Sequence, residues 1–126
     1  MSSDSSPIRI LVVDDHQLIR VGIATLLLPE PDMKLVGEAS NGREAITKFR
    51  ERDPDVTLMD LQMPEMNGFD AVLAIRDEFP RARIIILTTY AGDAQAQRAI
   101  KAGAQGYLLK NLLHKRLNKT ATKSEF

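Results

Sequence analysis

The sequence contains no cysteine and no tryptophan, and only 5% of its 126 residues are aromatic. Without cysteine, a disulfide framework, a thiolate zinc site and a cysteine nucleophile are all excluded. The apolar runs are short: Ile84–Leu87 is one of the longest, far below the ~18 residues that span a bilayer. The first seven residues, MSSDSSP, lack the basic flank and apolar core of a signal peptide. We therefore expect a cytoplasmic protein with no membrane partner.

The formal net charge is zero, but the charge is unevenly distributed. Residues 1–110 carry 13 basic and 16 acidic side chains, whereas residues 111–126 carry four basic side chains and one acidic one. The mildly acidic body gives no reason to expect nucleic-acid binding. The basic tail is short and lacks interleaved aromatics, so a solvated helix end is the simpler interpretation. We expect no direct contact between this chain and nucleic acid.

Short apolar runs alternate with helical patterns along a chain whose length suits one domain. We expect strands at 8–13, 33–39, 56–60, 83–89 and 106–110, and helices at 17–28, 40–52, 67–79 and 93–103. A candidate fifth helix follows residue 110. Near-continuous apolar strands separated by helices indicate a parallel sheet covered on both faces. The sequence predicts an α/β fold, a flavodoxin-like doubly wound five-stranded parallel sheet of order 2-1-3-4-5.

Polar residues stand where the expected strands end. Asp14 and Asp15 follow the first strand, Asp60 ends the third, Thr88 the fourth and Lys110 the fifth. In the predicted order the first and third strands are neighbours, so three carboxylates converge at the edge where ligands bind. Such carboxylates raise one another's pKa unless a cation neutralises them, and all-oxygen ligands suit Mg²⁺. Together with a lysine and a hydroxyl, they make a site for phosphorylating an aspartate.

Each of these residues has a simpler interpretation when it is taken alone. Asp14 and Asp15 precede a helix and would be N-caps, and Asp60 would cap the turn that follows it. Lys110 would be a solvated lysine and Thr88 an ordinary strand residue. Their joint placement at strand ends is what favours a site. His16 is a poor Mg²⁺ ligand, and we expect it to be exposed in the first helical turn.

Four stretches of residues 8–110 carry a specific resemblance: LVVDDH, LMDLQMPEMNG, ILTTYAGD and AGAQGYLLK, in this order. Together they resemble the receiver domain of bacterial two-component response regulators. Within that family, DDHQLIRVGI, GEASNGREA, LTTY and GYLLK resemble most the receivers that precede a LuxR/NarL-type helix-turn-helix. The resemblance implies a phosphorylation-activated signalling switch, not an enzyme in the usual sense. Its donor would be a sensor histidine kinase, and its role would be transcription regulation through a DNA-binding domain absent from this chain.

The resemblance also implies roles for individual residues, carried over by position. Asp60 would be the phospho-acceptor, with Lys110 pairing with the phosphoryl oxygens and Thr88 as the switch hydroxyl. The remaining roles fall on residues around them: metal ligation by Asp14, Asp15, Asp60 and the backbone carbonyl of Gln62, a rotamer change at Tyr107, tuning of acyl phosphate hydrolysis by Gln62 and Tyr90, and shaping of the loop by Pro64 and Gly68.

Two other classes of function remain open on the sequence. One is an Mg²⁺-dependent phosphohydrolase with an aspartate nucleophile. Such enzymes usually carry a general-acid aspartate two residues after the nucleophile, where this chain has Gln62. The other is a protein-interaction module that works without phosphorylation, against which the intact acidic set argues. The Gln62 position favours a slow switch over a turnover enzyme.

The end of the chain departs from the family pattern. Residues 111–126 offer about two turns of amphipathic pattern and then weak helix formers, so we expect the fifth helix to be short or displaced. We hypothesise that a homodimer, symmetric or with an exchanged helix, covers the apolar strip left on the first helix. The expected division is a disordered N-terminus at 1–7, a receiver domain at 8–120 and a tail at 121–126. His114, in that region, has no evident partner.

Overall fold

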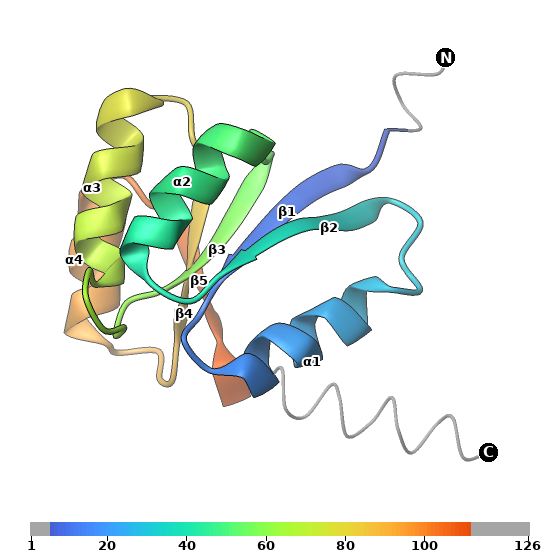
Figure 1. Ribbon diagram of the computed structural model, residues 1–126. Coiled ribbons are helices and arrows are strands. Elements are labelled where there is room, and N and C mark those ends of the chain that lie inside the picture. Colours follow the sequence, from blue (N-terminus) through green and yellow to red (C-terminus); the bar gives the residue numbers. More distant parts are fainter. Residues whose placement is uncertain (1–5, 112–126) are drawn as a thin grey trace.

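The computed structural model describes residues 6–111, in which strands and helices alternate (Figure 1). The elements are β1 (Ile8–Val13), α1 (Gln17–Leu27), β2 (Met33–Ala39), α2 (Gly42–Arg52), β3 (Val56–Asp60), α3 (Gly68–Glu78), β4 (Ile84–Thr88), α4 (Ala94–Lys101) and β5 (Gly106–Leu109). All neighbouring strands pair in parallel, in the order β2-β1-β3-β4-β5. The predicted α/β fold and strand order are confirmed. The expectations for residues 1–5, the fifth helix, His114 and the tail lie outside the described residues.

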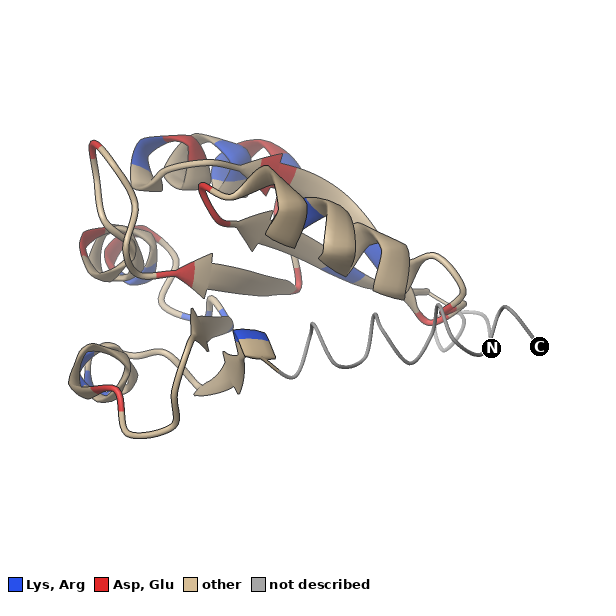
Figure 2. Cartoon of the chain, turned by 90° about the horizontal axis from the view of Figure 1, so that it is seen from below, with Lys and Arg blue, Asp and Glu red and all other residues tan. Residues whose placement is uncertain are grey.

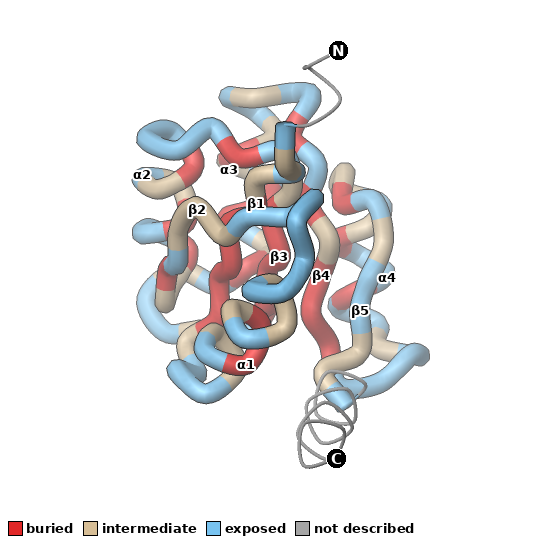
Figure 3. Tube along the Cα trace, turned by 90° about the vertical axis from the view of Figure 1, so that its right-hand side faces the viewer, coloured by how far each residue is buried: buried red, intermediate tan, exposed pale blue. Residues whose placement is uncertain are grey.

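Helices cover both faces of the sheet, with α2, α3 and α4 on one side and α1 on the other (Figure 1). Because successive strand side chains point to opposite faces, β1 supplies both layers. Leu11 and Val13 pack with the α2–α4 layer, and Ile10 and Val12 pack with the α1 layer. Burying each of these aliphatic side chains contributes about 1.5–3 kcal/mol. The tube view shows buried segments running through β1, β3 and β4, in contrast to β5 at the edge (Figure 3).

Local residue chemistry sets the helix ends. The side-chain oxygens of Asn41 and Asn67 accept from the backbone N–H groups of the third helical residue of α2 and α3, each at 2.9 Å. Asn41 is therefore the cap of α2. Gly103 follows α4 with φ of 127°, a conformation that glycine adopts without steric cost. The helix itself ends at Lys101, two residues earlier than expected.

The start of α1 corrects one of the simpler interpretations. The N-cap of this helix is His16, whose side chain makes no capping hydrogen bond. Asp14 instead accepts from the backbone N–H of His16 through Oδ1 at 2.8 Å. Neither Asp14 nor Asp15 is therefore the helix cap, and both carboxylates remain at the end of β1.

The loop after β3 passes very close to the start of α3. The backbone N–H of Gly68 donates to the carbonyl oxygen of Leu61 at 2.9 Å. A Cβ at Gly68 would collide with the carbonyl oxygen of Asp60 and lie 2.8 Å from Cα of Leu61. Only glycine permits this approach, and the close contact fixes the backbone at the end of β3 and at the start of α3.

None of the described helices is long and apolar enough to cross a membrane.

Candidate functional site

Acidic side chains gather at the carboxyl edge of the central strands. Asp14 and Asp15 follow β1 and Asp60 ends β3, and these strands pair directly through Val13 and Met59. Together with His16, each of the three carboxylates places one ligand atom within 4.8 Å of the others. Figure 2 shows this edge, with acidic segments at strand ends and a basic segment where the described chain ends. The predicted convergence of three carboxylates is therefore present.

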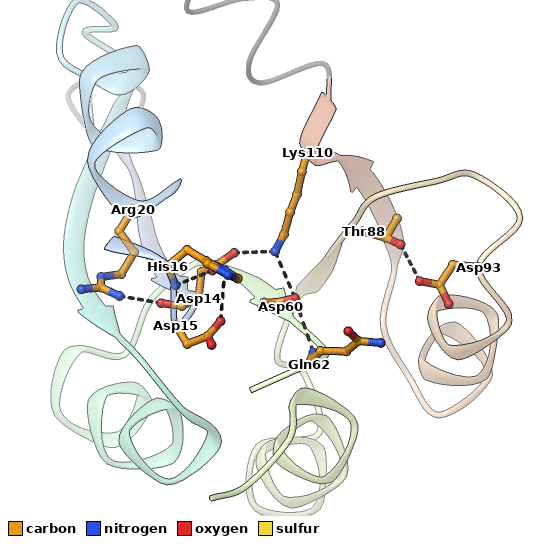
Figure 4. A network of polar contacts seen from close by, with 9 residues as sticks. All are labelled: Asp14, Asp15, His16, Arg20, Asp60, Gln62, Thr88, Asp93 and Lys110. Atoms are coloured by element: carbon orange, nitrogen blue, oxygen red, sulfur yellow. Dashed lines mark hydrogen bonds and ion pairs between the residues drawn. The ribbon is translucent and has the colours of Figure 1, made fainter. Parts of the chain in front are cut away.

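Lys110, directly after β5, reaches across this edge to two of the carboxylates. Its Nζ lies 2.9 Å from Oδ2 of Asp14 and 3.2 Å from Oδ1 of Asp60 (Figure 4). The lysine side chain is only 12% exposed and that of Asp14 is fully buried. The simpler interpretation of Lys110 as a solvated lysine is wrong. One ammonium group holds two carboxylates together.

Asp60 is a strongly perturbed acid. Burial and, second, the charge of Asp14 raise its pKa, Lys110 and the N–H of Gln62 lower it, and the net result is a pKa of about 6. Its Oδ1 accepts this N–H at 3.4 Å. Its Oδ2 is buried and accepts no hydrogen bond from any residue between 6 and 111. A buried acceptor without a partner is costly, so this oxygen is suited to a further ligand.

The charge of Lys110 is secured by the same contacts. Burial acts to lower its pKa, but the hydrogen bond to Asp14 and the charges of Asp60 and Asp14 outweigh burial and raise it above the ordinary lysine value. The ammonium form is therefore present throughout the physiological pH range. A fixed positive charge next to Asp60 is suited to holding an anionic group that arrives there.

Arg20 in α1 and His16, the N-cap of that helix, both contact the acidic edge. The Nη1 of Arg20 donates to the carbonyl oxygen of Asp14 at 2.6 Å, and its Nε lies 3.1 Å from Oε1 of Glu38 on β2. This arginine therefore ties the backbone at the end of β1 to the edge strand. The side chain of His16 is 65% exposed, with Nδ1 3.0 Å from Oδ1 of Asp14 and 3.2 Å from Oδ1 of Asp15. The expectation of an exposed histidine is confirmed.

The donor set fits a hard divalent cation. Three carboxylates meet at one point, two of them on buried residues, and the Oδ2 of Asp60 has no partner among the described residues. Oxygen ligands with room for water are what Mg²⁺ prefers. We expected a magnesium site from the sequence, and the structure establishes the acidic cluster that such a site requires.

Thr88 ends β4 and is nearly buried, but its hydroxyl does not bond to Asp60. Oγ1 donates to Oδ2 of Asp93 at 2.7 Å (Figure 4). The other oxygen of Asp93 accepts from the N–H groups of Gln95 and Ala96 at the start of α4. Tyr107 lies on β5 and is 41% exposed.

A cleft of about 400 Å³ opens beside Asp60. Its lining brings together residues predicted for the site from three segments of the chain: Asp60, Gln62, Thr88, Tyr90 and Lys110. The side chain of Tyr90, which also lines this cleft, is largely exposed. A small anionic group entering the cleft meets both the lysine and the aspartate.

Sequence reasoning missed two residues that this geometry brings into the site. Asp93 lies in ILTTYAGD and directly precedes the Ala-rich helix, so its capping role was detectable, but its bond to Thr88 was not. Arg20 interrupts an apolar helix pattern, and nothing in the sequence indicates that it reaches the Asp14 carbonyl. Both contacts depend on the tertiary arrangement of separate elements.

Comparison with known proteins agrees with this geometry. Residues 10–122 match the family model described as response regulator receiver domain. The response regulator protein VraR of Staphylococcus aureus is 41% identical over 103 residues, which cover 82% of this chain and 49% of VraR. The chain thus spans about half the length of the curated relatives it matches.

Solved structures give the same assignment. A LuxR-family two-component response regulator from Aurantimonas sp. is 41% identical with a TM-score of 0.77, over 83% of this chain and 75% of that one. The signal receiver domain of the NarL-type regulator from Mycobacterium tuberculosis is 30% identical with a TM-score of 0.80, over 94% and 96% of the two chains. The chain is a member of the response regulator receiver domain family, of the LuxR/NarL type.

Proposed function

We propose that Asp60 is the phospho-acceptor of this receiver and that a sensor histidine kinase is its donor. The observation that carries the proposal is the position of Asp60. It is buried at the end of a central strand, 3.2 Å from a lysine ammonium and beside Asp14, and it opens to a cleft. No other described carboxylate combines a lysine contact with a place in the lining of this cleft.

In the proposed reaction a carboxylate oxygen of Asp60 attacks the phosphorus of a phosphohistidine. A P–O bond forms and gives an acyl phosphate, while the P–N bond breaks and its electron pair remains on the imidazole nitrogen. Lys110 pairs with the phosphoryl oxygens, since its ammonium already lies at the acceptor carboxylate. The raised pKa of Asp60 is a feature of the free site, and a bound cation would favour its ionised form.

Magnesium is the proposed cofactor, held by Asp14, Asp15, Asp60 and the backbone carbonyl of Gln62. When bound, it would neutralise charge on the transferring phosphoryl group. The protein's own residues supply the rest. Asp14 and Asp15 would bind the metal ion, Lys110 would orient the phosphoryl group, and the buried strand ends keep the carboxylates in place. Thr88 is proposed to supply the switch hydroxyl. Tyr107 is the aromatic residue proposed to change its rotamer when Thr88 moves. Gln62 and Tyr90 line the approach to Asp60 and are proposed to tune hydrolysis.

A slow switch explains the site better than a turnover hydrolase does. Gln62 stands where the general acid of an aspartate-nucleophile hydrolase is expected, and an amide cannot donate and recover a proton at neutral pH. The described residues that line the cleft supply one other carboxylate, Asp93, and that group is engaged with Thr88 and the start of α4. We propose slow autodephosphorylation in place of catalytic turnover.

The wider role follows from the family. We propose a cytoplasmic receiver that regulates transcription, as the regulatory part of a protein with a DNA-binding domain that this chain does not include, and no nucleic-acid contact by the chain itself. A homodimer remains a hypothesis. The hypothesis is based on apolar surface in and just after α1, where three side chains are at least half exposed: Leu18, Val21 and Leu28.

One experiment tests the phospho-acceptor. The chain is incubated with a small-molecule phosphodonor and Mg²⁺ and weighed intact. We expect a gain of one phosphoryl group that requires Mg²⁺ and is lost in Asp60→Asn. Asp55→Asn is the matched control, because this aspartate lies before β3 at the opposite end of the same strand. A gain that persists in Asp60→Asn would refute the assignment, as would a wild-type chain that gains no mass.

A further inference from the structure

Asp93 accepts the hydrogen bond of the Thr88 hydroxyl, which is the proposed switch hydroxyl, and so competes for it with a phosphoryl group on Asp60. Thr88 ends β4, and its hydroxyl donates to Oδ2 of Asp93 at 2.7 Å. Thr88 is only 4% exposed, so water does not readily replace this bond. A threonine hydroxyl carries one proton and can donate to one acceptor at a time. A bond to Asp93 and a bond to an anionic group on Asp60 therefore exclude each other.

The second oxygen of Asp93 has a different partner. Oδ1 accepts from the N–H groups of Gln95 at 2.8 Å and Ala96 at 3.4 Å, which makes Asp93 the N-cap of α4. A single carboxylate thus joins the switch hydroxyl to the first turn of a helix. The hydrogen bond from Thr88 is also the main cause that lowers the pKa of Asp93, so the acceptor is charged at neutral pH.

We propose that Asp93 is a positioning residue that holds the Thr88 hydroxyl on α4 and so opposes phosphorylation-driven switching. The inference rests on the proposed function of Asp60 and goes beyond it. When Thr88 turns toward a phosphoryl group, Oδ2 of Asp93 loses its partner while Oδ1 still caps the helix. The cap carboxylate is then held through Oδ1 alone, and this links phosphorylation of Asp60 to the start of α4. By reciprocity, any contact that strengthens the Asp93–Thr88 bond weakens phosphoryl binding.

Asp93→Asn separates the two roles of the carboxylate. Asparagine is as good an N-cap as aspartate, so its oxygen keeps the bonds to Gln95 and Ala96. Its amide NH₂ replaces Oδ2 and cannot accept the proton of Thr88. The substitution therefore releases the proton of the hydroxyl for another acceptor and leaves the helix start in place. Asn41→Ala is a matched control, because it removes the cap of a different helix, α2.

The probe is beryllofluoride with Mg²⁺, a stable mimic of the phosphoryl group, titrated calorimetrically into the full chain. Since hydrogen bonds to a charged acceptor are among the stronger ones in proteins, we expect Asp93→Asn to bind about three- to tenfold more tightly than wild type. The gain should disappear in a Thr88→Val background, where there is no hydroxyl to release. Asp93→Ser, which keeps a capping oxygen, serves as a second variant if the asparagine variant folds poorly.

The possible results separate the two proposals. A wild-type chain that does not bind beryllofluoride refutes the assignment of Asp60 and the role of Asp93 with it. Normal wild-type binding with equal or weaker binding by both Asp93 variants overturns the role of Asp93 alone. An equal gain in the Thr88→Val background also overturns it, because the effect would not pass through the hydroxyl. A similar gain in Asn41→Ala would show a general effect of weaker capping and would count against the proposal.

Discussion

The Nζ of Lys110 lies 3.2 Å from Oδ1 of Asp60, and the same ammonium lies 2.9 Å from Oδ2 of Asp14. β5 and β1 are separated in the sheet by β3 and β4, so the lysine must cross the edge to reach both acids. Two nearly buried carboxylates with one cation leave an excess negative charge. Burial and the negative charge of Asp14 together raise the pKa of Asp60, so the ionised carboxylate lowers the stability of the folded protein at neutral pH.

The first prediction concerns this instability. In the presence of a chelator at pH 7–8, Asp60→Asn should be more stable than wild type by about 1–3 kcal/mol. The reason is that the pKa of the Asp60 carboxyl in wild type is about 6 in the folded state, against an ordinary value of 3.8 for aspartate. The folded protein binds the proton more tightly, so wild-type stability rises as the pH falls through 6 toward 4. The difference between the two proteins should therefore shrink over that range. Urea unfolding at several pH values measures it.

Two results would contradict this account of Asp60. An asparagine variant that is less stable than wild type at pH 7.5 would mean that the ionised carboxylate is favourably placed in the free site. A stability difference that stays constant between pH 7.5 and pH 4.5 would mean that its protonation is not the cause. Addition of Mg²⁺ gives an internal check, because it should stabilise wild type more than Asp60→Asn.

The second prediction concerns Lys110. Lys110→Met keeps the length of the side chain and removes its charge, which leaves the carboxylates of Asp14 and Asp60 unpaired. Breaking a buried ion pair typically costs about 3–5 kcal/mol, and protonation of Asp60 should relieve part of it, so we expect a loss of about 2–4 kcal/mol at pH 7.5. The loss should be smaller at pH 5. Because the ammonium no longer repels a cation, Mg²⁺ should stabilise the variant by more than it stabilises wild type.

Lys101→Met provides the control for the lysine. Lys101 is the last residue of α4 and is exposed, so removal of its charge should change stability by less than about 0.5 kcal/mol. It should also leave the effect of Mg²⁺ unchanged. If the two methionine variants lost equal stability, the Lys110 contacts would be of no more consequence than a surface charge. Thermal unfolding with and without Mg²⁺ is the measurement.

The sequence predicts most of this fold because its signals are local. Apolar runs mark the strands, and apolar residues at helical spacing mark the helices between them. The carboxyl-edge rule then brings Asp14, Asp60 and Lys110 to one edge without any knowledge of side-chain geometry. What it does not predict is which acceptor the hydroxyl of Thr88 selects. That choice depends on where the loop before α4 places Asp93, and a loop path is a tertiary property.

The same limit applies to the start of α1, where the simpler interpretation of Asp14 and Asp15 as N-caps is wrong. Aspartate is a favoured N-cap, so a pair of aspartates before a helix indicates capping. Here the chain continues one residue further, and Asp14 bonds to the N–H of His16 from outside the helix. The displacement frees both carboxylates for the acidic edge. A propensity describes the average use of a residue type, and functional sites are where such averages are most often overridden.

The third prediction tests the close approach after β3. Gly68→Ala should destabilise the protein by at least about 2 kcal/mol, because the added Cβ meets the backbone of Asp60 and Leu61, which cannot move without shifting the strand end. Since the displaced atoms carry Asp60, phosphorylation should slow as well. Gly106→Ala is the control, as a Cβ there has no neighbour within 4 Å among the described residues. Comparable losses in the two variants would refute the role of the contact.

The last prediction concerns Arg20, which we expect to support metal binding without touching the metal. Its guanidinium holds the carbonyl of Asp14 at 2.6 Å and pairs with Glu38, so it fixes the backbone that presents the carboxylate. Arg20→Gln should weaken Mg²⁺ binding by about threefold to tenfold, since the loss of a hydrogen bond to a charged donor at this position costs about 1 kcal/mol or more. Calorimetric titration of Mg²⁺ measures the change.

Arg50→Gln is the comparison that separates this effect from a general loss of arginine pairs. Arg50 makes a two-pronged pair with Glu78 on the surface, and both side chains are substantially exposed. Exposed pairs of this kind contribute about 0–1 kcal/mol to stability, and this one lies away from the acidic edge. We expect unchanged Mg²⁺ affinity in Arg50→Gln. Equal affinities in wild type and Arg20→Gln would mean that the Asp14 carboxylate keeps its position without the arginine, and that β1 alone is rigid enough to present it.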